Sequence, residues 1–282
     1  MTVRFGLLGA GRIGKVHARA VTASPDARLV AVADAIAPAA EAIATAYGAE
    51  VRTIDAIAAA DDLDAVVICT PTDTHADLIE RFARAGKAIF CEKPIDLDVA
   101  RVRACLKVVE ATGARLMVGF NRRFDQHFRA LRRAIDDGRI GTVEMVTLVS
   151  RDPGAPPLDY IARSGGIFRD MSIHDFDMAR WLLGEEPVAV SAHAAVLTDP
   201  AIRAAGDFDS ANVLLETASG RQAVITNSRR DHAAYAAEIA AFVAGLRDGT
   251  PLAPSGADGL AALLLADAAV RSVAEGRRIP VG

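Results

Sequence analysis

A glycine-rich turn near the N-terminus limits the possible folds more than any other feature of this sequence. The segment Gly9-Ala10-Gly11-Arg12-Ile13-Gly14 follows the apolar run Val3–Leu8 and opens a helical pattern. Such a turn brings backbone N–H groups close to a pyrophosphate, and the helix N-terminus adds partial positive charge. A glycine-rich turn alone is a weak signal, because an ordinary strand-to-helix turn also contains glycines. In this strand–turn–helix context we predict that all six residues contact a dinucleotide.

An acidic residue at the end of the next predicted strand supports the same site. Asp34 closes the run Leu29–Asp34 and follows Gly14 by twenty residues, a spacing at which a carboxylate accepts the ribose hydroxyls of a dinucleotide. It would repel the 2′-phosphate of NADP, and residues 35–37 contain no arginine to bind that phosphate. We therefore predict NAD as the cofactor, against the alternative that Asp34 is only a solvated residue at a strand end.

The first 120 residues alternate short apolar runs with longer helical patterns. The predicted strands are Val3–Leu8, Leu29–Asp34, Ala65–Ile68, Ala88–Cys91 and Leu116–Gly119, with a weaker one at Glu50–Thr53. The predicted helices between them are Ile13–Ala23, Pro38–Tyr47, Thr74–Ala85 and Val99–Thr112. Apolar strands bounded by helices on both sides indicate a parallel sheet covered on both faces. We therefore predict an α/β fold whose N-terminal domain, residues 1–120, is a doubly wound parallel Rossmann sheet that binds NAD.

After residue 121 the chain turns to longer strand-like runs with few helices between them. The strands are expected at Thr142–Arg151, Pro187–Leu197, Ser210–Thr217 and Arg221–Ser228, and the helices at Gln126–Asp137, Asp175–Leu183, Ala233–Arg247 and Gly259–Glu275. This pattern predicts a C-terminal α+β domain, residues 121–282, with a large open, mostly antiparallel sheet. Apolar residues of Val143–Ser150 fall on both faces of the expected strand. We therefore expect helices on one face and a partner subunit on the other, so that this domain binds substrate and forms a homo-oligomer.

Composition narrows the classes of function. The formal net charge is -4, with acidic and basic residues interspersed, so no basic patch favours nucleic acid as a partner. The apolar stretch Leu260–Val270 is interrupted by Asp267 and is too short to cross a bilayer. Cys69, Cys91 and Cys105 lack C-x-x-C spacing, which predicts buried free thiols in a reducing compartment and no metal site. We therefore expect a cytoplasmic protein without a nucleic-acid or membrane partner.

Two further strand ends lie at the edge where parallel sheets bind ligands. Thr70 and Pro71 follow a predicted strand, and we predict that they pack along the dinucleotide. His75 follows them at the start of a helix and is a weaker candidate for a cofactor contact. The alternative for this segment is structural, with Thr72 or Asp73 as the cap of the helix.

The triplet Glu92-Lys93-Pro94 follows the predicted strand Ala88–Cys91. It places a carboxylate and an ammonium group at the same ligand-binding edge of the sheet. Proline restricts the backbone beside the lysine, with a cis bond as one option, and so aims the lysine side chain. A lysine at a strand end is usually a solvated charge, but this position predicts a functional Lys93, with Glu92 beside the cofactor.

In the second half of the chain, Asp170 and His174 are four residues apart, a spacing that puts both on one face of a helical turn. Oxidation of an alcohol requires removal of the hydroxyl proton as hydride leaves the same carbon. A neutral histidine accepts such a proton near neutral pH, and a carboxylate beside it fixes the tautomer and stabilises the imidazolium. We predict His174 as the base and Asp170 as its partner. The structural alternative, a capping box formed by Ser172 and Asp175, is compatible with this role.

Together these motifs resemble the Gfo/Idh/MocA oxidoreductases. The resemblance rests on the turn at residues 9–14, the triplet Glu92-Lys93-Pro94, and the segment from Gly165-Gly166 through Asp170 to His174-Asp175. Residues 67–75 and 118–124 resemble in particular the bacterial inositol 2-dehydrogenases of that family. The resemblance covers nearly the whole chain. It implies a Rossmann domain followed by an α/β domain with a large open sheet, usually assembled as a tetramer across such sheets.

The resemblance also implies an activity: NAD-dependent oxidation of a cyclic polyol, myo-inositol to 2-keto-myo-inositol (scyllo-inosose), by hydride transfer to nicotinamide. By resemblance, Lys93 orients the substrate hydroxyl and the nicotinamide, His174 acts as the base, and Asp170 assists it. The implied substrate contacts are Lys93, Asn121, Arg122, Asp152, Asp170 and His174. Of these, Asp152 is the weakest candidate, because an acid in a loop is more often solvated.

The chain departs from the family in one respect. Its 282 residues fall short of such enzymes by roughly fifty, an estimate from usual family and domain sizes. After Arg230 the sequence passes through Asp231-His232 almost directly into residues 233–238, which resemble a later helix of the family. A real loss at this place would shorten the second domain and remove edge strands that help to wall the pocket.

Two rival functions follow from these observations. One is a dehydrogenase of another polyol or sugar, such as an inositol epimer or glucose, with the same machinery and a different pocket. The other is a non-catalytic regulator that binds NAD. The presence of Lys93, Asp170 and His174 argues against the regulator, whereas the short second domain argues for it.

Overall fold

The computed structural model describes residues 2–152, 156–197, 199–229 and 235–281. The chain divides into two compact units, the first made of residues 1–124 and 234–260 and the second of residues 125–233 and 261–282. The segment after Arg230, where the sequence suggests a shortened domain, includes residues 230–234, which lie outside the described residues.

The first unit is built on a six-stranded parallel sheet. Its strands are β1 (Val3–Leu8), β2 (Ala27–Ala33), β3 (Glu50–Val51), β4 (Ala65–Ile68), β5 (Ala88–Cys91) and β6 (Leu116–Val118). They lie in the order β3-β2-β1-β4-β5-β6, and every pair is parallel. The doubly wound Rossmann sheet predicted from the sequence is therefore confirmed. The strand order reverses between β1 and β4, the point at which such sheets bind dinucleotides.

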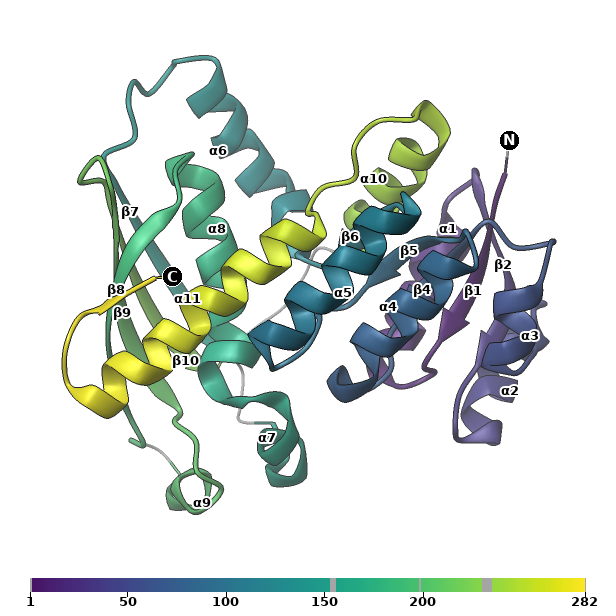
Figure 1. Cartoon of the computed structure of the whole chain (residues 1–282), viewed down its shortest axis with the longest axis horizontal. Coiled ribbons are helices and arrows are strands. Elements are labelled where there is room, and N and C mark those ends of the chain that lie inside the picture. The colour runs from purple at the N-terminus through teal and green to yellow at the C-terminus, as the bar shows by residue number, and fades with distance from the viewer. Residues whose placement is uncertain (1, 153–155, 198, 230–234, 282) are drawn as a thin grey trace. The chain divides into compact units, whose positions relative to one another are not determined.

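Helices cover both faces of this sheet. They are α1 (Arg12–Ala23), α2 (Ala37–Tyr47), α3 (Ile54–Ala59), α4 (His75–Arg84), α5 (Val99–Thr112) and α10 (Tyr235–Asp248). Helices α4 and α5 lie side by side in Figure 1. Although α10 comes late in the chain, Phe242 packs its ring against Phe5 and Phe90, with centroids 6.0 and 5.6 Å apart. These contacts tie α10 to the core of the first unit.

The second unit contains a five-stranded sheet in the order β11-β8-β9-β10-β7. The strands are β7 (Met145–Asp152), β8 (Pro187–Ala195), β9 (Ser210–Thr217), β10 (Gln222–Arg229) and β11 (Ile279–Pro280). The predicted antiparallel pairing holds for β8–β9, β9–β10 and β11–β8, whereas β7 and β10 run parallel. Because helices and two strands separate β7 from β10 in the sequence, no hairpin forces these two strands to be antiparallel.

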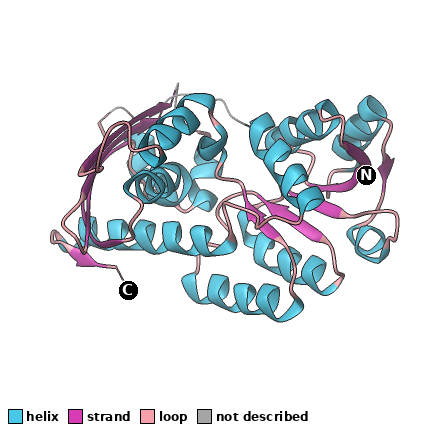
Figure 2. Ribbon diagram, turned by 90° about the horizontal axis from the view of Figure 1, so that it is seen from above, coloured by secondary structure: helices cyan, strands magenta, loops and turns pink. Residues whose placement is uncertain are grey.

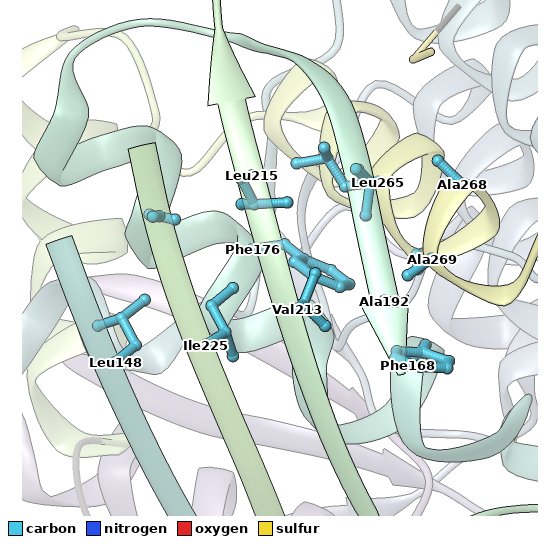
Figure 3. Close-up of a cluster of buried hydrophobic side chains, with 14 of the residues drawn as sticks. Leu148, Phe168, Phe176, Ala192, Val213, Leu215, Ile225, Leu265, Ala268 and Ala269 are labelled. Carbon is cyan, nitrogen blue, oxygen red and sulfur yellow. The ribbon is translucent and has the colours of Figure 1, made fainter. Parts of the chain in front are cut away.

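Helices cover one face of this second sheet in Figure 2. The helices of the unit are α6 (Gln126–Asp136), α7 (Leu158–Ser164), the π-helix η3 (Phe168–Ser172), α8 (Ile173–Leu183), α9 (Pro200–Ala204) and most of α11 (Gly256–Glu275). Figure 3 shows inward side chains of the sheet pointing toward residues of η3, α8 and α11; those it labels are Leu148, Phe168, Phe176, Ala192, Val213, Leu215, Ile225, Leu265, Ala268 and Ala269. Ser255 and Asp258 form a capping box at the start of α11, since Ser255 N donates to Asp258 Oδ2 at 2.7 Å and Asp258 N to Ser255 Oγ at 3.4 Å.

Apolar side chains lie exposed on the opposite face of the sheet. Met145 and Val149 of β7 are 75% and 63% exposed, and Val224 of β10 is 41% exposed. All three have the strand parity opposite to that of the buried Leu148 and Ile225. Patches of this kind on soluble proteins often mark contact surfaces.

Candidate active site

The glycine-rich turn between β1 and α1 has the geometry of a phosphate cradle. Gly9 has a φ of +95°, and a Cβ there would lie 2.5 Å from the carbonyl oxygen of Cys69. A Cβ on Gly14 would overlap the carbonyl oxygen of Gly9. Helix α1 begins at Arg12 without a side-chain cap and without an acid in its first turn. Its first N–H groups are therefore suited to an anion such as a pyrophosphate.

Asp34 lies beside this turn, just after the end of β2. Its Oδ2 accepts a hydrogen bond from Ala10 N at 2.5 Å, and its Oδ1 accepts one from Ile36 N at 2.7 Å. The side chain is only partly buried, so its oxygens can accept further hydrogen bonds. A carboxylate fixed in this place is suited to the ribose hydroxyls of NAD.

The segment after β4 differs from the predicted cap. Neither Thr72 nor Asp73 caps α4; these residues belong to a short 3-10 helix, and α4 begins at His75 without a side-chain cap. Instead, Thr74 Oγ1 donates to Thr70 Oγ1 at 2.6 Å and also lies 2.7 Å from Pro71 O. The turn that follows β4 is thus closed by its own hydroxyl groups.

His75 lies beneath this turn and is only 2% exposed. Its Nε2 lies 2.7 Å from the carbonyl oxygen of Thr70, and its Nδ1 lies 2.8 Å from that of Pro94. Burial lowers the pKa of His75 and outweighs the two carbonyl groups, which favour the protonated ring. Both ring nitrogens are thus engaged by backbone atoms.

The triplet Glu92-Lys93-Pro94 follows β5, and its Lys93–Pro94 peptide bond is cis. Glu92 is 8% exposed, and its Oε1 lies 2.6 Å from Nε2 of the fully buried His17 on α1. Lys93 itself is half-buried. The signal for His17 in the sequence is its place on the face of α1 that otherwise carries small and apolar residues toward the sheet.

Asn121 and Arg122 lie in the 3-10 helix η2 (Asn121–Phe124), directly after β6, and both are half-buried. The neighbouring Arg123 donates to Asp258 Oδ1 at 2.9 Å. This ion pair anchors η2 to the start of α11 within the first unit. The anchor holds Asn121 and Arg122 at the carboxyl end of the sheet.

In the second unit, Asp170 lies in η3 and His174 in the first turn of α8, and both are half-buried. The sequence did not predict the π-helix, a rare distortion that often occurs at functional sites. It also did not single out Tyr160 of α7, whose hydroxyl donates to Asp170 Oδ1 at 2.9 Å. The carboxylate of Asp170 is therefore oriented from a neighbouring helix.

The capping box considered for Ser172 and Asp175 is not formed, because α8 has no side-chain cap. Asp175 is fully buried and instead accepts hydrogen bonds from Ser150 Oγ at 2.6 Å and from Asn227 Nδ2 at 2.7 Å. Ser172 Oγ donates to Asn227 Oδ1 at 2.5 Å. The start of α8 is thus bound to β10 through buried side chains and to β7 through the half-buried Ser150, next to His174. Asp152 lies at the end of β7, half-buried.

A second buried contact holds Ile167, between the pair Gly165-Gly166 and η3. Asp207 Oδ1 accepts from Ile167 N at 2.8 Å, and Asp207 Oδ2 accepts from Arg229 Nη2 at 2.5 Å. Gly166 has a φ of +79°, and a Cβ there would lie 2.7 Å from Asp207 Oδ1. Asp207 is far from Gly166 in sequence, so the sequence pattern did not reveal it.

The described residues contain no group of three or more side chains able to hold a metal ion. Among the same residues, no helix has both the length and the apolar character needed to cross a membrane. Cys69, Cys91 and Cys105 form no disulfide bond within the described part of the chain, and Cys69 is half-buried whereas the other two are buried.

Three family models match the chain. Residues 3–120 match the oxidoreductase family with an NAD-binding Rossmann fold, residues 128–247 match the GFO/IDH/MocA C-terminal domain, and residues 221–281 match the oxidoreductase C-terminal alpha/beta domain. The resemblance predicted from the motifs is confirmed by these matches.

Individual relatives agree with the family models. The chain is 66% identical to the inositol 2-dehydrogenase of Rhizobium meliloti, with all of both chains covered. That alignment spans 329 positions against 282 residues here, so about 47 positions have no counterpart in this chain.

The chain is also similar to solved structures of inositol dehydrogenases. A myo-inositol dehydrogenase from Corynebacterium glutamicum superposes with a TM-score of 0.94 at 38% identity, covering 100% of this chain and 99% of that one. A scyllo-inositol dehydrogenase from Lactobacillus casei, solved with bound NAD(H) and scyllo-inositol, superposes with a TM-score of 0.91 at 25% identity and the same coverage. The chain therefore belongs to the Gfo/Idh/MocA family of oxidoreductases, and its cofactor is NAD.

Proposed function

We propose that this chain oxidises a cyclic polyol, myo-inositol to 2-keto-myo-inositol (scyllo-inosose), with NAD as the electron acceptor. The observation that carries the proposal is the 66% identity, over the full length of both chains, to an inositol 2-dehydrogenase. The polyols in the names of the structural relatives support the same class of substrate.

In the proposed reaction, each of three side chains has its own role. NAD, when bound, would supply the acceptor for the hydride of the substrate carbon. His174 accepts the proton of the hydroxyl group on that carbon, and Asp170 stabilises the imidazolium that results. The ammonium group of Lys93 donates to the substrate oxygen and keeps it oriented. Tyr160 supports this assignment of Asp170, because its hydroxyl fixes one carboxylate oxygen.

The cofactor and substrate contacts that we propose are those predicted from the sequence. The proposed cofactor contacts are Gly9, Ala10, Gly11, Arg12, Ile13, Gly14, Asp34, Thr70, Pro71, His75, Glu92 and Lys93. The proposed substrate contacts are Lys93, Asn121, Arg122, Asp152, Asp170 and His174. Residues 1–120 are proposed as the NAD-binding domain and residues 121–282 as the domain for substrate binding and oligomerisation.

The test is formation of NADH by the full chain, followed by its absorbance, with myo-inositol, scyllo-inositol, other epimers and glucose supplied side by side. We expect the highest kcat/KM with myo-inositol and a loss of at least about 100-fold in kcat for His174→Ala, the usual contribution of a general base. A wild-type rate in His174→Ala removes the base from the proposal. A preference for glucose or for an inositol epimer replaces the substrate.

One observation favours a second candidate, a regulator that binds NAD without turnover. About 47 aligned positions of the Rhizobium meliloti enzyme have no counterpart in this chain. Tight NAD binding, measured by calorimetry, without NADH formation from any polyol of the panel would favour this candidate over the dehydrogenase.

We also propose that the protein is a cytoplasmic homotetramer whose subunits cover the exposed face of the second sheet. The support is the apolar set Met145, Val149 and Val224 on that face. Light scattering should give the mass of four chains, and Val149→Lys should yield smaller species. Val51→Lys, at a half-exposed position of β3 in the first unit, is the matched control. A monomeric wild type contradicts the tetramer, and cell fractionation tests the location.

A further inference from the structure

The residues on both sides of Lys93 are each held by a buried histidine. Glu92 precedes Lys93, and its carboxylate meets the ring of His17. Pro94 follows Lys93, and its carbonyl oxygen meets the ring of His75. The two histidines are 0% and 2% exposed. Neither lies near the triplet in sequence.

The contact between His17 and Glu92 is short and enclosed. The distance from Nε2 to Oε1 is 2.6 Å, and the imidazole ring also packs on Phe90, with ring centroids 4.9 Å apart. The other carboxylate oxygen, Oε2, lies 3.3 Å from Lys93 N. At Gly119 a Cβ would lie 3.3 Å from the same carboxylate, so this side chain fills its space closely. A buried carboxylate that lost its partner would carry a large desolvation cost.

His75 makes the second contact through a different nitrogen. Its Nδ1 faces Pro94 O at 2.8 Å, and its Nε2 faces Thr70 O at 2.7 Å. A neutral imidazole donates from one nitrogen, whereas the protonated ring donates from both. Asparagine and glutamine at position 75 can therefore test the two contacts one at a time. The amide group of asparagine reaches approximately the position of Nδ1, and that of glutamine reaches approximately the position of Nε2.

We propose that His17 and His75 are positioning residues for Lys93: His17 fixes Glu92, and His75 fixes the carbonyl group of Pro94. The role of Lys93 in turnover rests on the proposed function. The positioning itself is a property of the first unit.

The same histidines connect Lys93 to the cofactor site. His17 lies on α1, whose first turn forms part of the phosphate cradle. Through Nε2, His75 also reaches Thr70, in the turn predicted to pack along the dinucleotide. The ammonium group and the cofactor-binding turns are thereby held in one rigid frame, which is the condition for effective orientation of a substrate.

The first test measures the position of Lys93 without turnover. The chain contains only four lysines, at positions 15, 87, 93 and 107. Brief acetylation in the absence of NAD, followed by peptide mass spectrometry, gives the reactivity of Lys93 relative to the exposed Lys107. We expect His17→Phe and His75→Gln to raise this ratio, because they keep the volume but release Glu92 or Pro94.

The conservative variants should restore the wild-type state. His17→Gln returns a donor near the Nε2 position, and His75→Asn returns one near the Nδ1 position, so both should keep Lys93 at its wild-type reactivity. In turnover, His17→Phe and His75→Gln should lose about 10- to 100-fold in kcat, the cost of a misplacement of about 1 Å. In His17→Phe, which changes no proposed cofactor contact directly, the KM for NAD should change far less than kcat.

Two controls separate positioning from simple loss of stability. Val21→Ala on α1 and Ile79→Val on α4 remove buried apolar groups from the same helices, at positions 1% and 0% exposed. They should lower the melting temperature but leave both the acetylation ratio and kcat unchanged. If they raise the ratio as much as His17→Phe and His75→Gln do, the positioning role is overturned.

The outcomes also separate this inference from the proposed function. If the wild-type chain binds NAD but oxidises no polyol, the acetylation ratios still decide whether the histidines position Lys93. If the wild-type chain turns over and His17→Phe and His75→Gln match it in both ratio and kcat, the positioning role is wrong and the dehydrogenase stands.

Discussion

Asn227 donates a hydrogen bond from its side-chain amide to Asp175 Oδ2 at 2.7 Å, and the two residues are 2% and 0% exposed. This contact joins the end of β10 to the first turn of α8. Because Asp175 directly follows His174, the bond helps to fix the backbone of the proposed base. A buried carboxylate in the second unit therefore has a structural role beside the catalytic one proposed for its neighbour.

Asn227→Ala should destabilise the protein, because it leaves a buried carboxylate short of one donor. We expect the free energy of unfolding to fall by about 2 kcal/mol or more, measured by urea denaturation. Asn212→Ala, at an exposed position of the neighbouring strand β9, is the matched control and should change it little. Equal losses in the two variants would contradict a special role for the buried contact.

Gly11→Ala and Gly14→Ala should separate cofactor binding from folding. A Cβ on Gly11 meets no atom of the protein within 4 Å, whereas one on Gly14 overlaps the carbonyl oxygen of Gly9. Gly11→Ala should therefore keep the wild-type melting temperature and lose NAD affinity, because its methyl group enters the space proposed for the pyrophosphate.

Gly14→Ala, in contrast, should lower both melting temperature and NAD affinity. Differential scanning fluorimetry and calorimetric titration with NAD provide the two measurements. Wild-type affinity in Gly11→Ala would place the pyrophosphate elsewhere.

Asp34→Asn should weaken discrimination between NAD and NADP. In the proposed site, the carboxylate of Asp34 repels a 2′-phosphate and accepts charge-assisted hydrogen bonds, each worth about 1.5–3 kcal/mol, from the ribose hydroxyls. We expect the ratio of the Kd for NADP to that for NAD to fall roughly 10- to 100-fold. Asp26→Asn, at a loop position just before β2, is the control and should leave the ratio unchanged. An unchanged ratio in Asp34→Asn would remove this residue from the ribose site.

Much of the fold could be predicted because its signals are local. The strands β1, β4 and β5 are apolar runs bounded by helical patterns, and their predicted bounds agree with the structure. The π-helix η3 was missed, because it depends on packing against residues distant in sequence. The parallel pairing of β7 with β10 was missed for the same reason, since the residues between them do not encode which strand edges meet.

In the candidate site, too, residues with a local sequence signal were predicted and residues with distant partners were not. Gly9, Gly14 and Asp34 were recognisable because their spacing repeats in dinucleotide sites. His17 and Asn227 were not, because their partners, Glu92 and Asp175, lie 75 and 52 residues away in sequence. A short-range pattern carries no information about a contact made only after the chain has folded.

The buried thiols predict a loss of stability at alkaline pH. Burial raises the pKa of Cys105 from its ordinary 9.0 to about 12 and raises the pKa of Cys91 well above the same value. The folded state therefore holds these protons more tightly than the unfolded state, so this contribution to stability is complete below pH 9 and is lost as pH rises toward 12.

The burial of each thiol should also decide how fast it reacts in the folded protein. At about pH 8, a disulfide reagent should modify the half-buried Cys69 first and the other two thiols only after unfolding, because thiolates are the reacting species. In Cys69→Ser the fast reaction should disappear. Fast labelling of all three thiols in the folded protein would contradict this order.

Tyr160→Phe tests whether the orientation of Asp170 matters to turnover. The variant removes the hydroxyl that donates to Asp170 Oδ1 at 2.9 Å and keeps the ring. Tyr160 is 44% exposed, so the bond competes with water and is worth about 1 kcal/mol, which corresponds to roughly a fivefold lower kcat. The KM for NAD should not change, since Tyr160 is not among the proposed cofactor contacts. Tyr47→Phe in the first unit applies the same change away from Asp170. If both variants turn over at the wild-type rate in steady-state assays, the tyrosine does not contribute to the orientation of the proposed catalytic carboxylate.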